Sequence, residues 1–134
     1  MILPNIENFI GCDSSFEEAE IVLYGAPFDS TTSFRPGARF GPSAIRHESF
    51  GLETYSPYQD RDLTDIQVFD SGDLELCFGS SEMALADIQN RAWKILEAGK
   101  IGKNAVASGG RASGDTGCCE SCRREISGTS YYSF

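Results

Sequence analysis

The segment 34–46 is the part of the chain whose residue types and spacing point most directly to chemistry. It reads Phe-Arg-Pro-Gly-Ala-Arg-Phe-Gly-Pro-Ser-Ala-Ile-Arg, so that arginines recur beside two Gly/Pro corners. Guanidinium groups bind carboxylates and phosphates through paired hydrogen bonds, and Pro and Gly give the backbone a defined turn. We assign Arg35 and Arg39 to the rim of a binding site or to a subunit contact. The alternative is a rigid strand-to-helix connection whose arginines are solvated.

Acidic side chains stand near the ends of two apolar runs, residues 21–24 and 66–70, which we predict to be strands. They are Asp29 and the two aspartates of the turn Asp70-Ser71-Gly72-Asp73. Aspartate in a strand-end turn commonly accepts hydrogen bonds from nearby backbone amides. We therefore interpret Asp29, Asp70 and Asp73 as turn and capping residues rather than catalytic residues. The single histidine, His47, follows the arginine-rich segment and is expected on a helix surface or in a loop, without a metal role.

Strands and helices must position these side chains. Short apolar runs at residues 21–24 and 66–70 each end in a polar turn that contains glycine, which is typical of buried strands in a parallel sheet. Pro42 stands where a helix can begin. Apolar residues at helical spacing predict a longer helix from residue 80 or 81 to about 98, with Trp93 packed against the sheet. This order indicates a doubly wound α/β fold, in which ligands collect at the carboxyl edge of the sheet.

Composition limits the classes of partner and compartment. A chain of 134 residues is one domain or part of one, and its net charge of −9 argues against nucleic acid, because phosphate binding needs a basic face. No apolar run is long enough to span a membrane, and the opening residues Met1–Pro4 do not form a secretory signal. The expected location is the cytoplasm, where disulfides are rare. Cys12 and Cys77 are accordingly expected to be ordinary buried or half-buried residues.

The character of the chain changes after Lys103. Residues 104–134 contain no leucine, and three of the five cysteines, Cys118, Cys119 and Cys122, crowd into this tail. Such a segment buries little apolar surface, so we expect it to be poorly ordered. The buried strand expected after the predicted second helix is missing. We therefore divide the chain into residues 1–103 and an aberrant tail, residues 104–134.

The motifs of the first part resemble the N-terminal signature of the ureohydrolases, the superfamily that includes arginase, formiminoglutamase and agmatinase. The matching motifs are Gly-Ala-Pro-Phe-Asp at 25–29, Thr-Thr at 31–32, Arg-Pro-Gly-Ala-Arg-Phe-Gly-Pro at 35–42, Ile-Arg at 45–46 and Asp-Ser-Gly-Asp at 70–73. The resemblance covers residues 1 to about 103, and within the superfamily it is closest to the agmatinases.

This resemblance implies a three-layer α/β/α arginase-like fold with a parallel sheet, of which the chain holds only the N-terminal part. It also implies a homo-oligomeric cytoplasmic enzyme with two bridged manganese ions, whose hydroxide attacks the guanidinium carbon of a substrate such as agmatine and releases urea and putrescine. The family's metal ligands come from Gly-Gly-Glu-His, Asp-Ala-His-x-Asp and Asp-x-Asp segments, and none of these occurs in this chain. We therefore expect a fragment of an agmatinase-like enzyme that is inactive as written and does not bind manganese properly.

A shifted reading frame accounts for the tail. We join the last two bases of each codon to the first base of the next. The junctions from Asn104 to Gly109 can then encode Met-Pro-Leu-Leu-Leu, and those from Gly109 to Ser113 can encode Gly-Gly-Glu-His. The junctions up to Phe134 can encode an amphipathic helix and a second buried strand. The codons of Lys103 and Asn104 can form a run of adenines, where one extra base would cause this shift. We therefore interpret the tail as the product of an interrupted agmatinase frame.

The tail taken at face value gives an alternative. Its three cysteines could ligate zinc or form a redox pair, although a structural zinc site requires four ligands, usually as two spaced pairs. The protein would then be a non-catalytic binding or regulatory module built on a ureohydrolase-like base.

Overall fold

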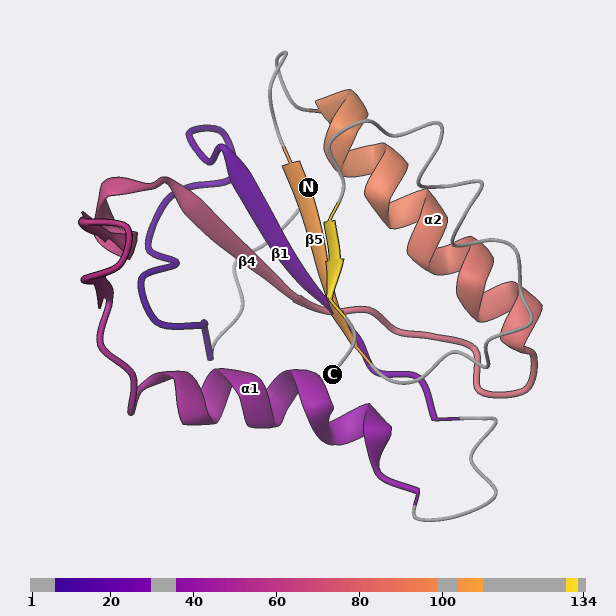
Figure 1. Cartoon of the computed structure of the whole chain (residues 1–134). Helices are drawn as coiled ribbons and strands as arrows, with labels where there is room; N and C mark the ends of the chain where they lie inside the picture. Colours follow the sequence, from indigo (N-terminus) through magenta and orange to yellow (C-terminus); the bar gives the residue numbers. More distant parts are fainter. Residues whose placement is uncertain (1–6, 30–35, 99–103, 110–129, 133–134) are drawn as a thin grey trace.

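The computed structural model describes residues 7–29, 36–98, 104–109 and 130–132 (Figure 1). Its centre is a parallel sheet of four strands in the order β4-β1-β5-β6. These strands are β1 (Ile21–Ala26), β4 (Val68–Asp73), β5 (Asn104–Gly109) and β6 (Ser130–Tyr132). Because the strands are parallel, their carboxyl ends share one edge of the sheet, as the sequence predicts.

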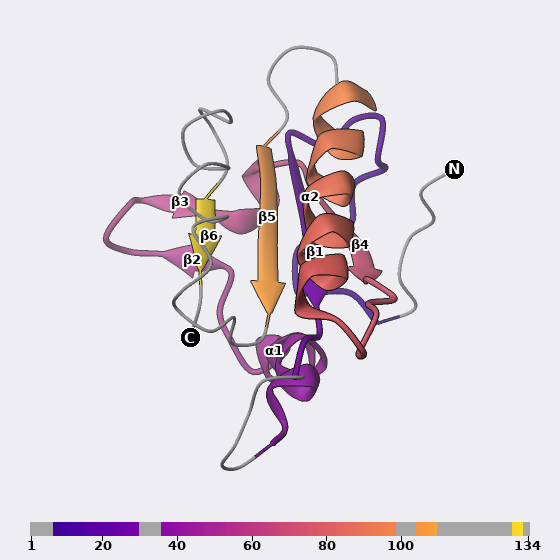
Figure 2. The ribbon, with the colours of Figure 1, turned by 90° about the vertical axis from the view of Figure 1, so that its right-hand side faces the viewer.

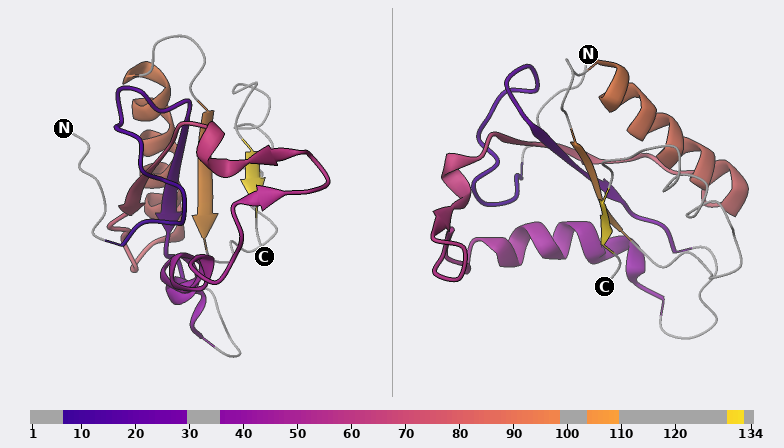
Figure 3. Two further views of the ribbon diagram at one scale, coloured as in Figure 1. Left: turned by 90° about the vertical axis from the view of Figure 1, so that its left-hand side faces the viewer. Right: turned by 45° about the horizontal axis from the view of Figure 1, so that its top comes forward.

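Two helices cover opposite faces of this sheet, as Figures 1 and 3 show. The first, α1 (Gly41–Ser49), connects β1 to β4, and the second, α2 (Ser81–Ala98), connects β4 to β5. The first connection moves toward the β4 edge and the second returns past β1, so right-handed crossovers place the helices on opposite faces. Within the described residues, neither helix is long and apolar enough to cross a bilayer. The layers match the predicted α/β/α arrangement.

A small hairpin lies apart from these layers. It consists of β2 (Tyr55–Ser56) and β3 (Arg61–Asp62), which pair antiparallel, and the 3-10 turn η2 (Leu63–Asp65) leads from it into β4. Figures 2 and 3 show the hairpin standing away from the body of the sheet. No sequence pattern predicts it, because each of its strands is only two residues long.

The apolar core lies between the sheet and α2. Val22 and Tyr24 alternate along β1 and are fully buried, and Ile95 of α2 belongs to the same cluster. Phe69 of β4 completes it, and the ring of Phe16 meets the Phe69 ring edge-on at a centroid distance of 5.7 Å. A second cluster combines Ala26, Phe28, Leu76 and Ala84. The helix α1 differs, because its buried residues include an arginine and a serine.

Several sequence predictions are confirmed. The strand β1 begins at Ile21, α2 covers residues 81–98, and Pro42 lies in the first turn of α1. The strand β4 begins at Val68 rather than at residue 66 and continues to Asp73, so the turn predicted at residues 71–73 is wrong and these residues belong to the strand. Cys12 is buried and Cys77 is half-buried, as expected.

The prediction that no strand follows α2 is wrong. The segment Asn104–Gly109 forms β5 and pairs in parallel with the whole length of β1. The crossover through α2 brings this segment to the second edge of β1, where unpaired backbone groups accept any extended chain. Backbone pairing therefore makes this strand without a run of large apolar side chains. The middle of the tail, residues 110–129, lies outside the described residues.

The placement of Trp93 against the sheet is also wrong, since this residue is 38% exposed. The buried positions of α2 belong to Ala84, Ala92 and Ile95. The next position after Ala92 is rotated by about 100° on a helix with 3.6 residues per turn. Trp93 consequently lies outside the buried face of α2.

Candidate functional site

The arginine-rich loop is fastened to the end of β1 by Asp29. The backbone amide of Gly37 donates a hydrogen bond to Asp29 Oδ2 at 2.6 Å, and Arg39 Nη1 lies 3.6 Å from the same oxygen. The Asp29 side chain is 1% exposed, whereas that of Arg39 is 49% exposed and its guanidinium lies 4.7 Å from the centroid of the Phe40 ring. Asp29 is thus a turn residue, as predicted. Arg35, the other predicted rim residue, lies outside the described residues.

The second anchor of the same segment is Arg46 on α1. Its Nε and Nη2 atoms donate to the two carboxylate oxygens of Asp70 at 2.7 and 2.9 Å, and Nη1 donates to Asp73 Oδ1 at 2.5 Å. The side chain is only 3% exposed. Burial alone would lower the pKa of Arg46, but the hydrogen bonds and charges of Asp70 and Asp73 raise it, so the guanidinium is always charged.

Asp70 has every hydrogen-bonding position filled. Besides the two bonds from Arg46, Oδ1 accepts from the amide of Gly72 at 2.9 Å and Oδ2 accepts from the amide of Phe9 at 3.0 Å. Its side chain is 0% exposed. A buried carboxylate with four donors is stable as an anion, but it has no free lone pair for a metal ion or a substrate. Asp70 therefore has a structural role, as predicted, but it lies within β4 rather than in a turn after the strand.

The ends of β1 and β4 approach α1 too closely for a side chain at Gly25. A Cβ atom there would overlap Asp73 Oδ1 and would lie 2.8 Å from Pro42 Cβ. Glycine at this position lets helix, strand end and carboxylate meet. We use the name carboxylate junction for Gly25, Pro42, Arg46, Asp70 and Asp73.

The N-terminal segment closes the carboxylate junction from one side. The amide of Ile10 donates to Ser49 Oγ at 3.0 Å, and Ser49 Oγ donates to the carbonyl of Arg46 at 2.6 Å. Cys12 lies buried in this segment, and burial, reinforced by the charges of Asp70 and Asp13, raises the pKa of its thiol to about 12. Cys12 is consequently an unreactive neutral thiol at physiological pH.

The described residues do not fit a pair of manganese ions. Within the described ranges, no group of three His, Cys, Asp or Glu side chains is placed to hold a metal ion. His47, which the sequence places on a helix surface, has a 76% exposed side chain whose Nδ1 lies 3.8 Å from Glu7 Oε1. Asp70 is saturated by protein donors. These residues therefore offer no hard-oxygen cage of the kind that manganese prefers.

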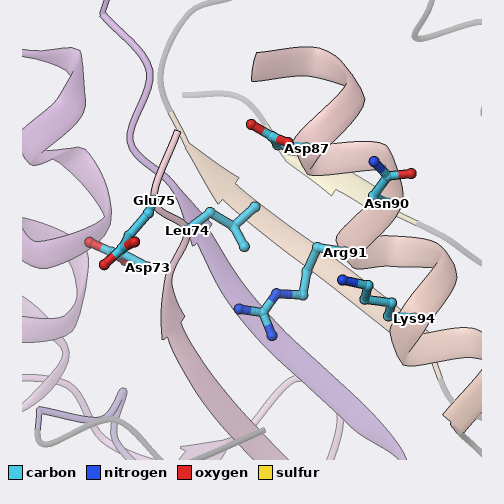
Figure 4. A pocket seen from close by; sticks show the side chains of 7 residues that line it. All are labelled: Asp73, Leu74, Glu75, Asp87, Asn90, Arg91 and Lys94. Atoms are coloured by element: carbon cyan, nitrogen blue, oxygen red, sulfur yellow. The ribbon is translucent and has the colours of Figure 1, made fainter. Parts of the chain in front are cut away.

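A cavity of about 570 Å³ opens between the end of β4 and the flank of α2. Figure 4 shows Arg91 and Lys94 reaching from α2 toward the strand end that carries Asp73 and Glu75. The remaining lining residues are Leu74, Asp87 and Asn90. Charges of both signs line this open space, so it favours no single class of ligand.

The sequence signals the loop and its carboxylates but misses the role of Arg46. One signal was available, because Pro42, Arg46 and Ser49 are spaced four and three residues apart and therefore share a helix face. All three are buried. An arginine on the buried face of a helix requires a carboxylate partner.

Comparisons with known proteins agree with this arrangement of motifs. A sequence profile described as the arginase family matches residues 19–129. The agmatinase of Bacillus anthracis is 52% identical over 93 residues, which cover 69% of this chain and 32% of that protein. This chain spans about a third of the length of that relative.

Solved structures give the same result. A Clostridium difficile protein provisionally assigned as an agmatinase is 44% identical, with a TM-score of 0.61 over 70% of this chain and 34% of that chain. The agmatine ureohydrolase of Thermoplasma volcanium is 27% identical, with a TM-score of 0.67 over 78% of this chain and 35% of that chain. The predicted arginase-like fold is confirmed, as its N-terminal part, and the chain belongs to the arginase family.

Proposed function

We propose that this chain is the N-terminal portion of an agmatinase whose reading frame is interrupted after Lys103, and that it is inactive as written. The intact enzyme would hydrolyse agmatine to putrescine and urea with two manganese ions, as a homo-oligomer in the cytoplasm. The motifs at residues 25–46 and 70–73 support the family, and the sequence identity to an agmatinase supports the substrate.

The position of β5 is the observation that carries the interrupted frame. Its register pairs Ile21 with Asn104 and Ala26 with Gly109, so β5 ends at the carboxyl edge beside the end of β1. In the shifted frame, the codons of this strand can encode Met-Pro-Leu-Leu-Leu. The junctions from Gly109 to Ser113, directly after it, can encode the Gly-Gly-Glu-His turn. A metal-ligand turn would thus start at the sheet edge where a ligand site belongs.

In the sequence as written, the described residues at this edge of the sheet offer no cluster of carboxylates placed to hold a metal ion. Asp29 and Asp70 are occupied by amides and guanidinium groups of their own chain. The described residues therefore supply rim and framework, and no group to activate water. Arg39 remains the candidate rim or subunit-contact residue, because its side chain is half exposed next to Asp29.

Sequencing the gene across codons 100–113 tests the interruption. We expect adenines at Lys103 and Asn104, and third bases that give Gly-Gly-Glu-His when one base is removed. The choice is restrictive, because Arg111 followed by Ala112 yields Glu only when the Arg111 codon is CGA or AGA. A different Arg codon there, or an Ala112 codon that does not end in A, would refute the proposal.

A metal-binding or redox-active tail remains the second prediction, since Cys118, Cys119 and Cys122 lie outside the described residues. Zinc content distinguishes the two interpretations. We expect no difference between the purified 134-residue chain and a variant with all three cysteines changed to serine. Stoichiometric zinc that disappears in the variant would support the binding module.

A further inference from the structure

The rim loop, residues 36–40, is held at both ends by charged groups and by little else. Near its start, Gly37 and Arg39 bind the buried carboxylate of Asp29. Its end continues through the 3-10 turn η1 (Ala38–Phe40) into α1, which Arg46 ties to Asp70 and Asp73.

Packing contributes little to the position of this loop. A Cβ atom built on Gly37 would meet no other atom within 4 Å, and the same holds for Gly41. Phe40, the only large apolar side chain of the loop, is 61% exposed. The two ionic anchors, together with the buried Pro42 directly after the loop, therefore determine where the loop lies on the sheet edge.

The Arg46 anchor depends on the shape of the guanidinium group. Three nitrogens of one side chain reach two carboxylates in the last four residues of β4, those of Asp70 and Asp73. A lysine ammonium is a point charge that cannot make this paired contact with Asp70 while also reaching Asp73. Gly25, near the end of β1, lies in close contact with Pro42 and Asp73. A shift of Arg46 and its helix would therefore also shift α1 relative to the end of β1.

We infer that Arg46 is a positioning residue of the ureohydrolase site. Acting through Asp70 and Asp73, it fixes the rim loop and thereby sets the affinity for the guanidino substrate. Arg46 makes no contact with substrate itself, because it is buried beneath the edge. This inference rests on the proposed function, in which the sheet edge is the substrate side of the enzyme.

The test uses the frame-restored enzyme with agmatine, comparing Arg46→Lys with the parent. We expect KM to rise about tenfold while kcat stays within about threefold, since a displaced rim weakens binding without changing the reacting groups. Asp29→Ala removes the other anchor, including the acceptor of the Gly37 hydrogen bond, and should raise KM in the same direction. Arg61→Lys, at an exposed position in β3, is the matched control and should leave both constants unchanged.

A role of Arg46 in stability alone predicts a different result for the kinetic constants. Arg46→Lys would then lower the thermal midpoint and the active fraction, and hence the apparent kcat, with KM unchanged. That result, or an equal rise of KM in Arg61→Lys, would overturn the inference. If Arg46→Lys does not fold, the Asp29→Ala result decides in the same way.

Hydrogen exchange separates this inference from the proposed function. In Arg46→Lys the Gly37 amide should exchange faster, while the amides of β1 remain protected. A restored protein that releases no urea would refute the proposed function alone, provided that Gly37 shows this change. Unchanged exchange at Gly37 would overturn the positioning role whether or not the enzyme is active.

Discussion

The carboxylate junction and the β2–β3 hairpin use the same residue types in opposite ways. In the junction, Asp70 is buried and accepts hydrogen bonds from segments far apart in the sequence, including Phe9 and Arg46. In the hairpin, Asp62 accepts solvent-exposed hydrogen bonds from the amide and hydroxyl of Thr64, two residues away. The difference teaches that an aspartate organises this fold only where water is excluded and distant segments converge on it.

The same substitution in both regions gives the largest contrast. Asp70→Asn leaves the buried Arg46 guanidinium without its main partner, and we expect a loss of about 3–5 kcal/mol in the free energy of unfolding. Asp62→Asn should leave the unfolding midpoint unchanged, because asparagine caps a helical turn as well as aspartate does. Chemical denaturation of the frame-restored protein measures both. Equal losses in the two variants would break the comparison.

A second contrast concerns glycine. Gly25→Ala forces Asp73 and Pro42 apart, and we expect it to cost about 2 kcal/mol or more. Gly79→Ala is the matched control, because its Cβ would meet only Cys77 Sγ, at 4.0 Å. The same denaturation experiment compares them. A Gly25→Ala protein as stable as the parent would show that the close approach is not required.

The buried thiol beside the carboxylate junction predicts a pH effect. The pKa of Cys12 rises from 9.0 to about 12 on folding, so the unfolded chain loses this proton first. The stabilisation by the neutral thiol is complete below pH 9 and is lost as pH rises toward 12. We expect the parent to lose about 1 kcal/mol more than Cys12→Ala between pH 8 and pH 10. Parallel pH profiles of the two proteins would contradict this.

The smallest effect belongs to the tip of the hairpin. Tyr58 is 99% exposed, so Tyr58→Ser should not shift the unfolding midpoint. The midpoint is measured beside that of the parent in the same titration. A clear destabilisation would mean that the hairpin packs against the body of the protein in solution.

The sequence predicts those parts of the fold where the pattern of side chains matches the secondary structure that the backbone forms. Apolar runs specify β1, Pro42 marks the start of α1, and helical periodicity specifies α2. The hairpin escapes prediction because its strands are too short to show a period. The strand β5 escapes because the open edge of β1, rather than its own side chains, places it in the sheet.

The candidate site likewise has residues whose roles could be predicted from the sequence and residues whose roles could not. The turn role of Asp29 follows from its position after a strand, and the structure confirms it. Asp70 lies within β4 rather than after it, and its structural role shows in the hydrogen bonds that its carboxylate accepts. The partnership of Arg46 with Asp70 could not be read from spacing, because it joins residues 24 apart through the geometry of the sheet. The helix face that carries Arg46 can be identified as buried only when it is known that α1 packs against the sheet.

Urea release from agmatine with added manganese tests the central claim most directly. The 134-residue chain and a protein with one base removed after codon 103 are assayed side by side. We expect no urea above background from the written chain and sustained turnover from the restored one. Robust turnover by the 134-residue chain, or a folded and manganese-loaded restored protein that releases no urea, would contradict the account.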